Sequence, residues 1–260
     1  MPFRFSVLPV PSVLNQLSVQ NNVAEVRRRI ADAARRAGRN PGEIMLMAVS
    51  KTHPPENIRE AYEAGLRAFG ENRVQEFAGK AADLADLKGA DWHLIGHLQS
   101  NKTAKAAELF SAVDSIDSLR LAQKLDAAAG SLGKKLQVLI EINIGGEEAK
   151  SGAAPESKEL EEILLAAPQL AHLEIRGLMT IPPYADDPQR SRPYFHKLRE
   201  LRDRIAARKL PAVEMSMLSM GMSHDFEVAI EEGSTCVRVG TAIFGERVKE
   251  LNAVAEEQKG

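Results

Sequence analysis

The sequence has a single cysteine, few aromatic residues (5% of the chain) and no apolar run of the roughly 18 residues that a membrane-spanning helix needs. Because Cys236 stands alone, no intrachain disulfide can form, and a reducing compartment is expected. Pro9 and Pro11 interrupt the apolar part of the opening stretch, which argues against a secretory signal. Positive and negative charges are nearly balanced, since the chain has 34 Lys and Arg residues and 36 Asp and Glu residues. These absences favour a cytoplasmic protein with no affinity for nucleic acid or membranes.

What is present is typical of a folded globular protein. The 260 residues are 44% hydrophobic and 27% charged, and a chain of this length fits one large domain or two small ones. No linker and no break in composition divides residues 18–255. We therefore expect an N-terminal extension over residues 1–17 and one domain over residues 18–260. We also expect a monomer.

Helical and strand periods alternate along the chain. An amphipathic helical face runs from Val19 to Ala37, and a strand that is apolar on both faces follows at 44–49. The other expected strands lie at 67–70, 92–95, 112–116, 137–143, 173–180, 214–219 and 235–239. Eight strand-then-helix units fit a (β/α)8 barrel better than an open doubly wound sheet. The predicted fold class is therefore α/β, a single TIM barrel.

In such a barrel the active face lies at the C-terminal ends of the strands, and Lys51 leaves the first strand there. A low-dielectric barrel mouth disfavours an ammonium ion, so the neutral amine of Lys51 could attack a carbonyl and form a Schiff base. The alternative is a solvated lysine at a strand end.

Two glycine-containing turns favour the Schiff-base lysine over the solvated one. Residues 218–225, with Ser219 and Ser223, follow the seventh strand, and residues 237–245 follow the eighth. Barrels commonly hold a phosphate at these two turns, where helix-start N–H groups are available. Gly240 allows close approach of the backbone to a ligand, and Thr241 adds a hydroxyl. A Schiff-base lysine facing a phosphate cradle favours pyridoxal 5′-phosphate (PLP), an aldehyde that bears a phosphate.

Several ordered blocks make the sequence similar to a known family. The blocks are Ala48–Thr52, Phe69–Asn72, Val74–Glu76, Trp92–Lys102, Gly177–Pro182, Leu218–Asp225 and Gly233–Gly245. They resemble the pyridoxal phosphate homeostasis protein family, the YggS/PROSC-type PLP-binding proteins, and the similarity extends over residues 19–248. The resemblance implies a barrel like the N-terminal domain of alanine racemase, the fold-type III arrangement of PLP proteins.

The resemblance also implies roles for individual residues. Lys51 would carry the PLP aldimine, and Arg238, which alternation on its strand could aim inward, would face the pyridine nitrogen and weaken the ring as an electron sink. The other cofactor-binding residues would be Asn72 near the ring and Ser219, Ser223, Gly240 and Thr241 around the phosphate. An acidic residue and a lysine after the fifth strand match Glu147 and Lys150. Arg73 departs from the tyrosine that is common in the family at this position.

Other conspicuous residues receive a structural interpretation. His93 and His97 fit barrel packing, although His97 could be a pocket group. Asp225 is interpreted as a helix cap and Cys236 as a small buried residue. The arginines between residues 27 and 39 are interpreted as a solvated helix face. No His, Cys or carboxylate cluster has metal-ligand spacing, so no metal is predicted.

The same resemblance leaves open whether the chain catalyses a reaction. Related racemases and decarboxylases add a β-domain that presents a second acid/base group over the cofactor. Little sequence follows Gly245, so we expect no C-terminal β-domain and an open face on the cofactor. The leading hypothesis is a non-enzymatic protein that stores, buffers or delivers PLP to apoenzymes and so affects amino-acid and keto-acid balance indirectly. Transaldimination with Lys150 would provide a route of release.

Two alternatives remain at this point. One is a PLP-dependent racemase or decarboxylase completed by another subunit. The other is an aldolase-like barrel in which Lys51 binds a sugar-phosphate carbonyl directly.

Overall fold

Eight parallel strands close into a barrel in chain order, and the first strand pairs with the last. The structure is a computed structural model that describes residues 12–147 and 151–245. The strands are β1 (Met45–Val49), β2 (Ala68–Glu71), β3 (Asp91–Leu94), β4 (Ala112–Ile116), β5 (Leu136–Glu141), β6 (Leu173–Met179), β7 (Val213–Met222) and β8 (Cys236–Val239). The α/β class and the TIM barrel predicted from the sequence are confirmed.

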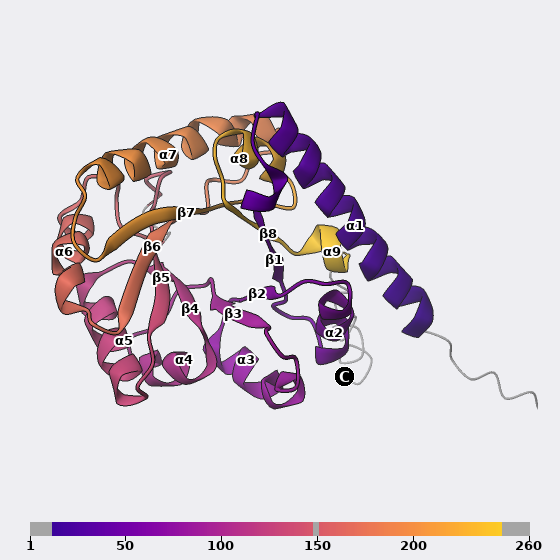
Figure 1. Ribbon diagram of the computed structural model, residues 1–260, viewed down its shortest axis with the longest axis horizontal. Helices are drawn as coiled ribbons and strands as arrows, with labels where there is room; N and C mark the ends of the chain where they lie inside the picture. The colour runs from indigo at the N-terminus through magenta and orange to yellow at the C-terminus, as the bar shows by residue number, and fades with distance from the viewer. Residues whose placement is uncertain (1–11, 148–150, 246–260) are drawn as a thin grey trace, which may run out of the picture.

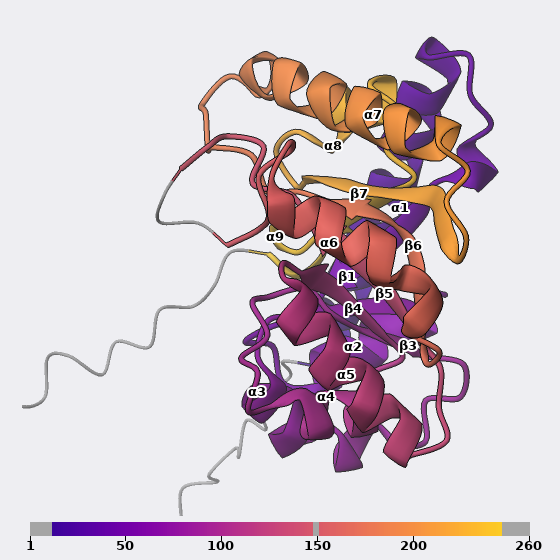
Figure 2. The same cartoon turned by 90° about the vertical axis from the view of Figure 1, so that its left-hand side faces the viewer.

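Helices surround the strands on the outside of the barrel (Figure 1). They are α1 (Ser12–Arg36), α2 (Pro55–Glu63), α3 (Val74–Lys80), α4 (Thr103–Leu109), α5 (Leu119–Ser131), α6 (Lys158–Ala166), α7 (Arg192–Ala207), α8 (Phe226–Glu231) and α9 (Thr241–Phe244). The side view in Figure 2 shows α7, α6, α5 and α4 following one another around one flank. The helix α1 begins at Ser12, inside the stretch predicted as an extension, and residues 1–11 lie outside the described part of the chain. The division into extension and barrel stays a prediction.

Alternation along the strands separates two apolar layers. The larger layer lies between strands and helices, where Leu94, Val113 and Leu178 are fully buried. The smaller layer fills the barrel lumen and includes Met47 and Cys236. Cys236 is completely buried, as predicted, and burial raises the pKa of its thiol to about 12.

The lumen also holds a buried histidine. His93 lies with Nδ1 3.2 Å from a carboxylate oxygen of Asp114 and Nε2 3.3 Å from one of Asp91. Burial lowers the pKa of His93, but the charges and hydrogen bonds of Asp114 and Asp91 outweigh it and raise the pKa to about 10. The interpretation of His93 as a packing residue therefore holds, with two carboxylates as its partners.

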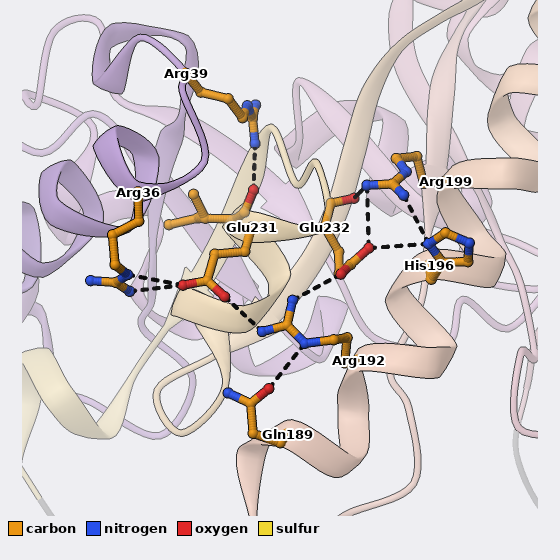
Figure 3. A network of polar contacts seen from close by, with 9 residues as sticks. Arg36, Arg39, Gln189, Arg192, His196, Arg199, Glu231 and Glu232 are labelled. Carbon is orange, nitrogen blue, oxygen red and sulfur yellow. Dashed lines mark hydrogen bonds and ion pairs between the residues drawn. The ribbon is translucent and has the colours of Figure 1, made fainter.

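A charged network joins α8 to α1 and α7 and so braces the seam where the barrel closes (Figure 3). Glu231 pairs with Arg36 of α1 and with Arg192 of α7. Glu232 pairs with Arg192 at 2.8 Å and with Arg199 at 3.2 Å. The network ties the helix after β7 to the first helix of the chain.

The arginine-rich segment predicted as a solvated helix face is engaged within the chain. The engaged guanidinium groups are those of Arg27, Arg28, Arg29, Arg35, Arg36 and Arg39. Their partners are carboxylates of the chain or carbonyl oxygens at loop and helix ends. These intrachain partners satisfy the arginine side chains without any contribution from nucleic acid. That the protein does not bind nucleic acid stays a prediction.

Candidate functional site

A cavity of about 280 Å3 opens at the C-terminal ends of the strands, the face where the sequence predicted the site. Its walls come from the segments after β1, β2, β3, β6, β7 and β8. Six predicted site residues line it: Lys51, Asn72, Ser223, Arg238, Gly240 and Thr241. Folding thus brings together side chains from opposite ends of the barrel sequence.

Lys51 reaches the cavity because it continues the inward alternation of β1. Met47 and Val49 face the lumen, so Lys51, two residues further on, faces its mouth. The lysine is half-buried. Thr52 follows with a φ of 65°, in the left-handed region that β-branched residues rarely adopt. The chain therefore turns sharply away as soon as the lysine is placed.

Arg238 supplies a buried cation to the cavity wall. Its Nη1 donates to the carbonyl oxygen of Ser219 at 2.7 Å and to the Ser219 hydroxyl at 2.6 Å. Its Nη2 donates to the carbonyl oxygen of Thr180 at 2.7 Å. Burial lowers the pKa of Arg238, and the charges of surrounding acidic groups oppose that effect. Because arginine remains protonated even when buried, the wall carries a fixed positive charge.

The structure places Ser219 differently from the other predicted residues. It is fully buried and does not line the cavity; its hydroxyl instead accepts from Arg238. Ser219 therefore holds the cation that lines the cavity.

The turns after β7 and β8 meet at the cavity. The hydroxyl of Ser223 accepts from the backbone N–H of Ala242, in the first turn of α9, at 3.3 Å. At Gly240 an added Cβ would lie 3.3 Å from the carbonyl oxygen of Val49. The glycine thus allows the end of β8 to pack tightly against the end of β1, and Thr241 follows at the rim.

Asp225 occupies the predicted cap position, but the prediction that its side chain caps the helix is wrong. Asp225 stands at the N-cap position of α8, but its carboxylate accepts the backbone N–H of Met222 at 2.8 Å instead of a helix N–H. The main chain must turn sharply there, because Gly221 has a φ of 94° and an added Cβ would lie 2.6 Å from Ala229. The carboxylate thus stabilises the turn that leads into the helix.

One wall was not predicted from the sequence. Ile181, Pro182, Pro183, Tyr184 and Ala185, after β6, line the cavity together with His53, Met222 and His224. The exposed fraction of Tyr184 is 79%, so it stands at the outer rim. The only sequence signal was the block Gly177–Pro182, which ends where this wall begins.

Other predicted groups lie away from the cavity. His97 is exposed, so its interpretation as a barrel-packing residue is wrong; it pairs with Asp117 at 3.3 Å and does not line the cavity. Glu147 lies in the loop after β5, where the side-chain amide of Asn143 donates to its carbonyl oxygen at 2.8 Å. Lys150 lies outside the described residues.

Comparison with known proteins defines the class of this barrel. A family model described as alanine racemase, N-terminal domain, matches residues 21–248. An alanine racemase of Clostridium difficile 630 shares the fold with a TM-score of 0.63 at 18% identity, over 90% of this chain and 58% of that chain. The chain is therefore an alanine racemase-type barrel.

Closer relatives identify the family. The pyridoxal phosphate homeostasis protein of Aquifex aeolicus (strain VF5) is 49% identical over 226 residues, which cover 86% of this chain and 96% of that protein. The solved structure of PipY of Synechococcus elongatus PCC7942 with PLP bound is 38% identical, with a TM-score of 0.73, over 87% of this chain and 100% of that chain. The chain belongs to the pyridoxal phosphate homeostasis protein family, and the resemblance found in the sequence is confirmed.

Among residues 12–147 and 151–245, no helix has the length and apolar character needed to cross a membrane. Within the same described ranges, no three His, Cys, Asp or Glu side chains gather into a group that could hold a metal ion.

Proposed function

We propose that this chain binds PLP covalently through Lys51 and acts in intracellular PLP homeostasis, holding the cofactor for storage, buffering or delivery. The observation that carries the proposal is one cavity lined by Lys51, by Arg238 with its buried guanidinium and by the hydroxyl-bearing turn at Thr241. The relative from Aquifex aeolicus is named a pyridoxal phosphate homeostasis protein, and PipY has a structure with PLP bound.

The lining groups fit this cofactor chemically. When bound, PLP supplies an aldehyde carbon, which forms a C=N bond to an amine with loss of water, and a phosphate. Lys51 would provide the amine at the low-dielectric mouth of the barrel. Ser223 and Thr241 would donate hydroxyl hydrogen bonds to the phosphate, and Gly240 leaves room for close approach of the backbone. Asn72, after the neighbouring strand β2, would lie near the ring.

Arg238 would set the electronic character of the ring. A fixed cation facing the ring nitrogen disfavours protonation of that nitrogen, and an unprotonated ring withdraws electrons less strongly. Ser219 and the carbonyl oxygen of Thr180 keep the guanidinium in place. We propose a PLP-binding protein that is not an enzyme, as the name of the homeostasis relative suggests.

The absorbance spectrum tests the proposal directly. Purified protein incubated with PLP should develop a visible band, and borohydride reduction followed by mass spectrometry should place the adduct on Lys51. The variant Lys51→Ala should lose both signals, whereas Lys105→Ala, at an exposed lysine of α4, should keep them. A wild-type protein that stays colourless with PLP would overturn the proposal. An adduct that forms with a sugar phosphate instead would favour the aldolase-like alternative.

A PLP-dependent racemase or decarboxylase is the second candidate, because the alanine racemases share this fold. NMR can follow exchange of the α-proton when the PLP-loaded protein is incubated with a panel of amino acids. A homeostasis protein should exchange these protons no faster than free PLP does. Exchange far above that rate would establish catalysis.

The proposed setting is the cytoplasm, with a monomeric protein that delivers PLP to apoenzymes. The single cysteine, which is completely buried, fits a reducing compartment. Mixing the loaded protein with a PLP-free enzyme tests delivery, since recovery of that enzyme's activity should outpace recovery with an equal amount of free PLP. Size-exclusion chromatography tests the monomer.

A further inference from the structure

A buried cluster of charged side chains lies behind the turn that carries Lys51. The ammonium of Lys80, on α3, lies 3.1 Å from the carbonyl oxygen of Ser50 and 3.3 Å from that of His53. It therefore donates to the main chain on both sides of Lys51. The side chain of Lys80 is only 9% exposed, so these bonds are shielded from water and strengthened by the low local dielectric.

Two glutamates complete the cluster. Glu71 lies 2.9 Å from the Lys80 ammonium, and the same carboxylate oxygen accepts the Ser50 hydroxyl at 2.6 Å. Glu76 lies 3.3 Å from the ammonium and accepts the backbone N–H of Thr52 at 2.5 Å. Burial raises the pKa of Glu71, and the charge of Lys80 opposes that shift. A buried cation is thus balanced by two carboxylates that also bond to the turn.

The turn needs such support because Thr52 is in the left-handed region, with a φ of 65°. A strained residue of this kind persists only where its surroundings hold it. Two more hydrogen bonds contribute: the N–H of Ser50 donates to Gly70 at 3.0 Å, and the N–H of His53 donates to Ser50 at 3.1 Å. The main chain of residues 50–53 is therefore fixed at both ends and in the middle, which determines where the Lys51 side chain begins.

We infer that Lys80 is a positioning residue for Lys51: with Glu71 and Glu76, its buried ammonium holds the turn so that the Lys51 amine faces the cavity and reacts with the aldehyde of PLP. This inference rests on the proposed function. It also extends to the neighbouring strand β2, because Glu71 directly precedes Asn72, a lining residue.

The test compares Lys80→Met with Lys80→Arg, which keeps the charge, and with Lys105→Met, at an exposed lysine of α4. Stopped-flow absorbance measures the rate at which PLP attaches. Calorimetry measures binding of pyridoxine 5′-phosphate, which has the phosphate but no aldehyde. Amide hydrogen exchange in the PLP-free protein reports on the turn itself, independently of any bound cofactor.

We expect Lys80→Met to slow attachment by about 10- to 100-fold, because a misplaced reacting group loses rate steeply. Pyridoxine 5′-phosphate should bind as in the wild type, and exchange at Thr52 and His53 should accelerate. Lys80→Arg should restore most of the rate, and Lys105→Met should change nothing. If Lys80→Met attached PLP at the wild-type rate and its amide hydrogens at Thr52 and His53 exchanged as in the wild type, the inference would be overturned. The proposed function would then still stand.

A second variant covers the case in which Lys80→Met does not fold. Glu76→Ala removes the acceptor of the Thr52 N–H from a partly exposed position and should slow attachment in the same way. An unchanged rate in Glu76→Ala would then overturn the inference. A wild-type protein that never attaches PLP would overturn the proposed function and this inference together.

Discussion

Arg238 and Ser219 share two hydrogen bonds from a single guanidinium nitrogen, at 2.7 Å to the carbonyl oxygen and 2.6 Å to the hydroxyl. Both residues are buried, so water cannot replace a lost bond. The pair links β8 to β7 at the floor of the cavity. The position of the cation therefore depends on a serine that does not itself line the cavity.

Ser219→Ala should weaken PLP binding by about 5-fold and lower the free energy of unfolding by about 1–2 kcal/mol, because Arg238 loses one buried acceptor. Urea unfolding and titration with PLP measure the two effects. Ser216→Ala is the matched control, since Ser216 lies on the same strand with an exposed side chain. Unchanged stability and affinity in Ser219→Ala would show that the hydroxyl does not hold the guanidinium.

Gly240→Ala should weaken PLP binding by about 10-fold, because its Cβ, 3.3 Å from the carbonyl oxygen of Val49, requires the end of β1 to shift by a few tenths of an ångström beside the cavity. Gly79→Ala is the control: Gly79 lies within α3 with nothing within 4 Å of an added Cβ. That variant should bind PLP normally and gain about 0.5–1 kcal/mol of stability from the better helix propensity of alanine. Equal PLP affinities in the two variants would contradict a role for close packing at Gly240.

The stability of the protein should fall as pH rises from 6.5 to about 10, because the protonated form of His93 is stabilised only in the folded state. Its pKa is about 10 in the fold and 6.5 without it, so the contribution is complete below pH 6.5 and is lost as pH rises through 10. Urea unfolding across this range should show a decline in the wild type that His93→Gln lacks. His97→Gln, at an exposed histidine, should follow the wild type. If the stability of the wild type and of His93→Gln declined in parallel with pH, the ion pairing of His93 with Asp114 and Asp91 would be refuted.

Glu232→Gln should lower the free energy of unfolding by about 2 kcal/mol at neutral pH, because Arg192 and Arg199 lose a largely buried partner. Burial raises the pKa of Glu232, but hydrogen bonds from Arg192 and His196 and the charges of the two arginines lower it overall. The contribution is therefore present above pH 4.5 and is lost as pH falls below that value.

A neighbouring glutamate provides the control for this network. Glu200 lies 3.3 Å from His196, but it is 54% exposed, so Glu200→Gln should change stability by less than about 0.5 kcal/mol. Thermal unfolding of both variants at neutral and acidic pH gives the comparison. If Glu232→Gln lost no more stability than Glu200→Gln, the network would not brace the seam.

Much of this barrel could be predicted from the sequence because strand and helix periods alternate along the chain. The strand at 112–116 lies where it was predicted, and Lys51 and Arg238 face the cavity because each continues an inward-facing row. The depth of Ser219 could not be predicted, because the register of β7 against β8 shifts between Ser219 and Met222. Residues 181–185 show neither helical nor strand periodicity, so the wall that they form could not be predicted. The hydrogen bond from the Met222 N–H to the Asp225 carboxylate depends on the conformation of one turn, which the sequence pattern does not reveal.

The pairing of β1 with β8 has a consequence during synthesis of the protein. Lys51 leaves the ribosome early, whereas Arg238, Gly240 and Thr241 follow only after six intervening strands. Closure of the barrel therefore has to wait for contacts between distant parts of the chain. A nascent chain that has exposed Lys51 but not yet β8 lacks the cavity wall formed by Arg238, Gly240 and Thr241, so under the proposed function it would retain PLP only after the last strand has emerged.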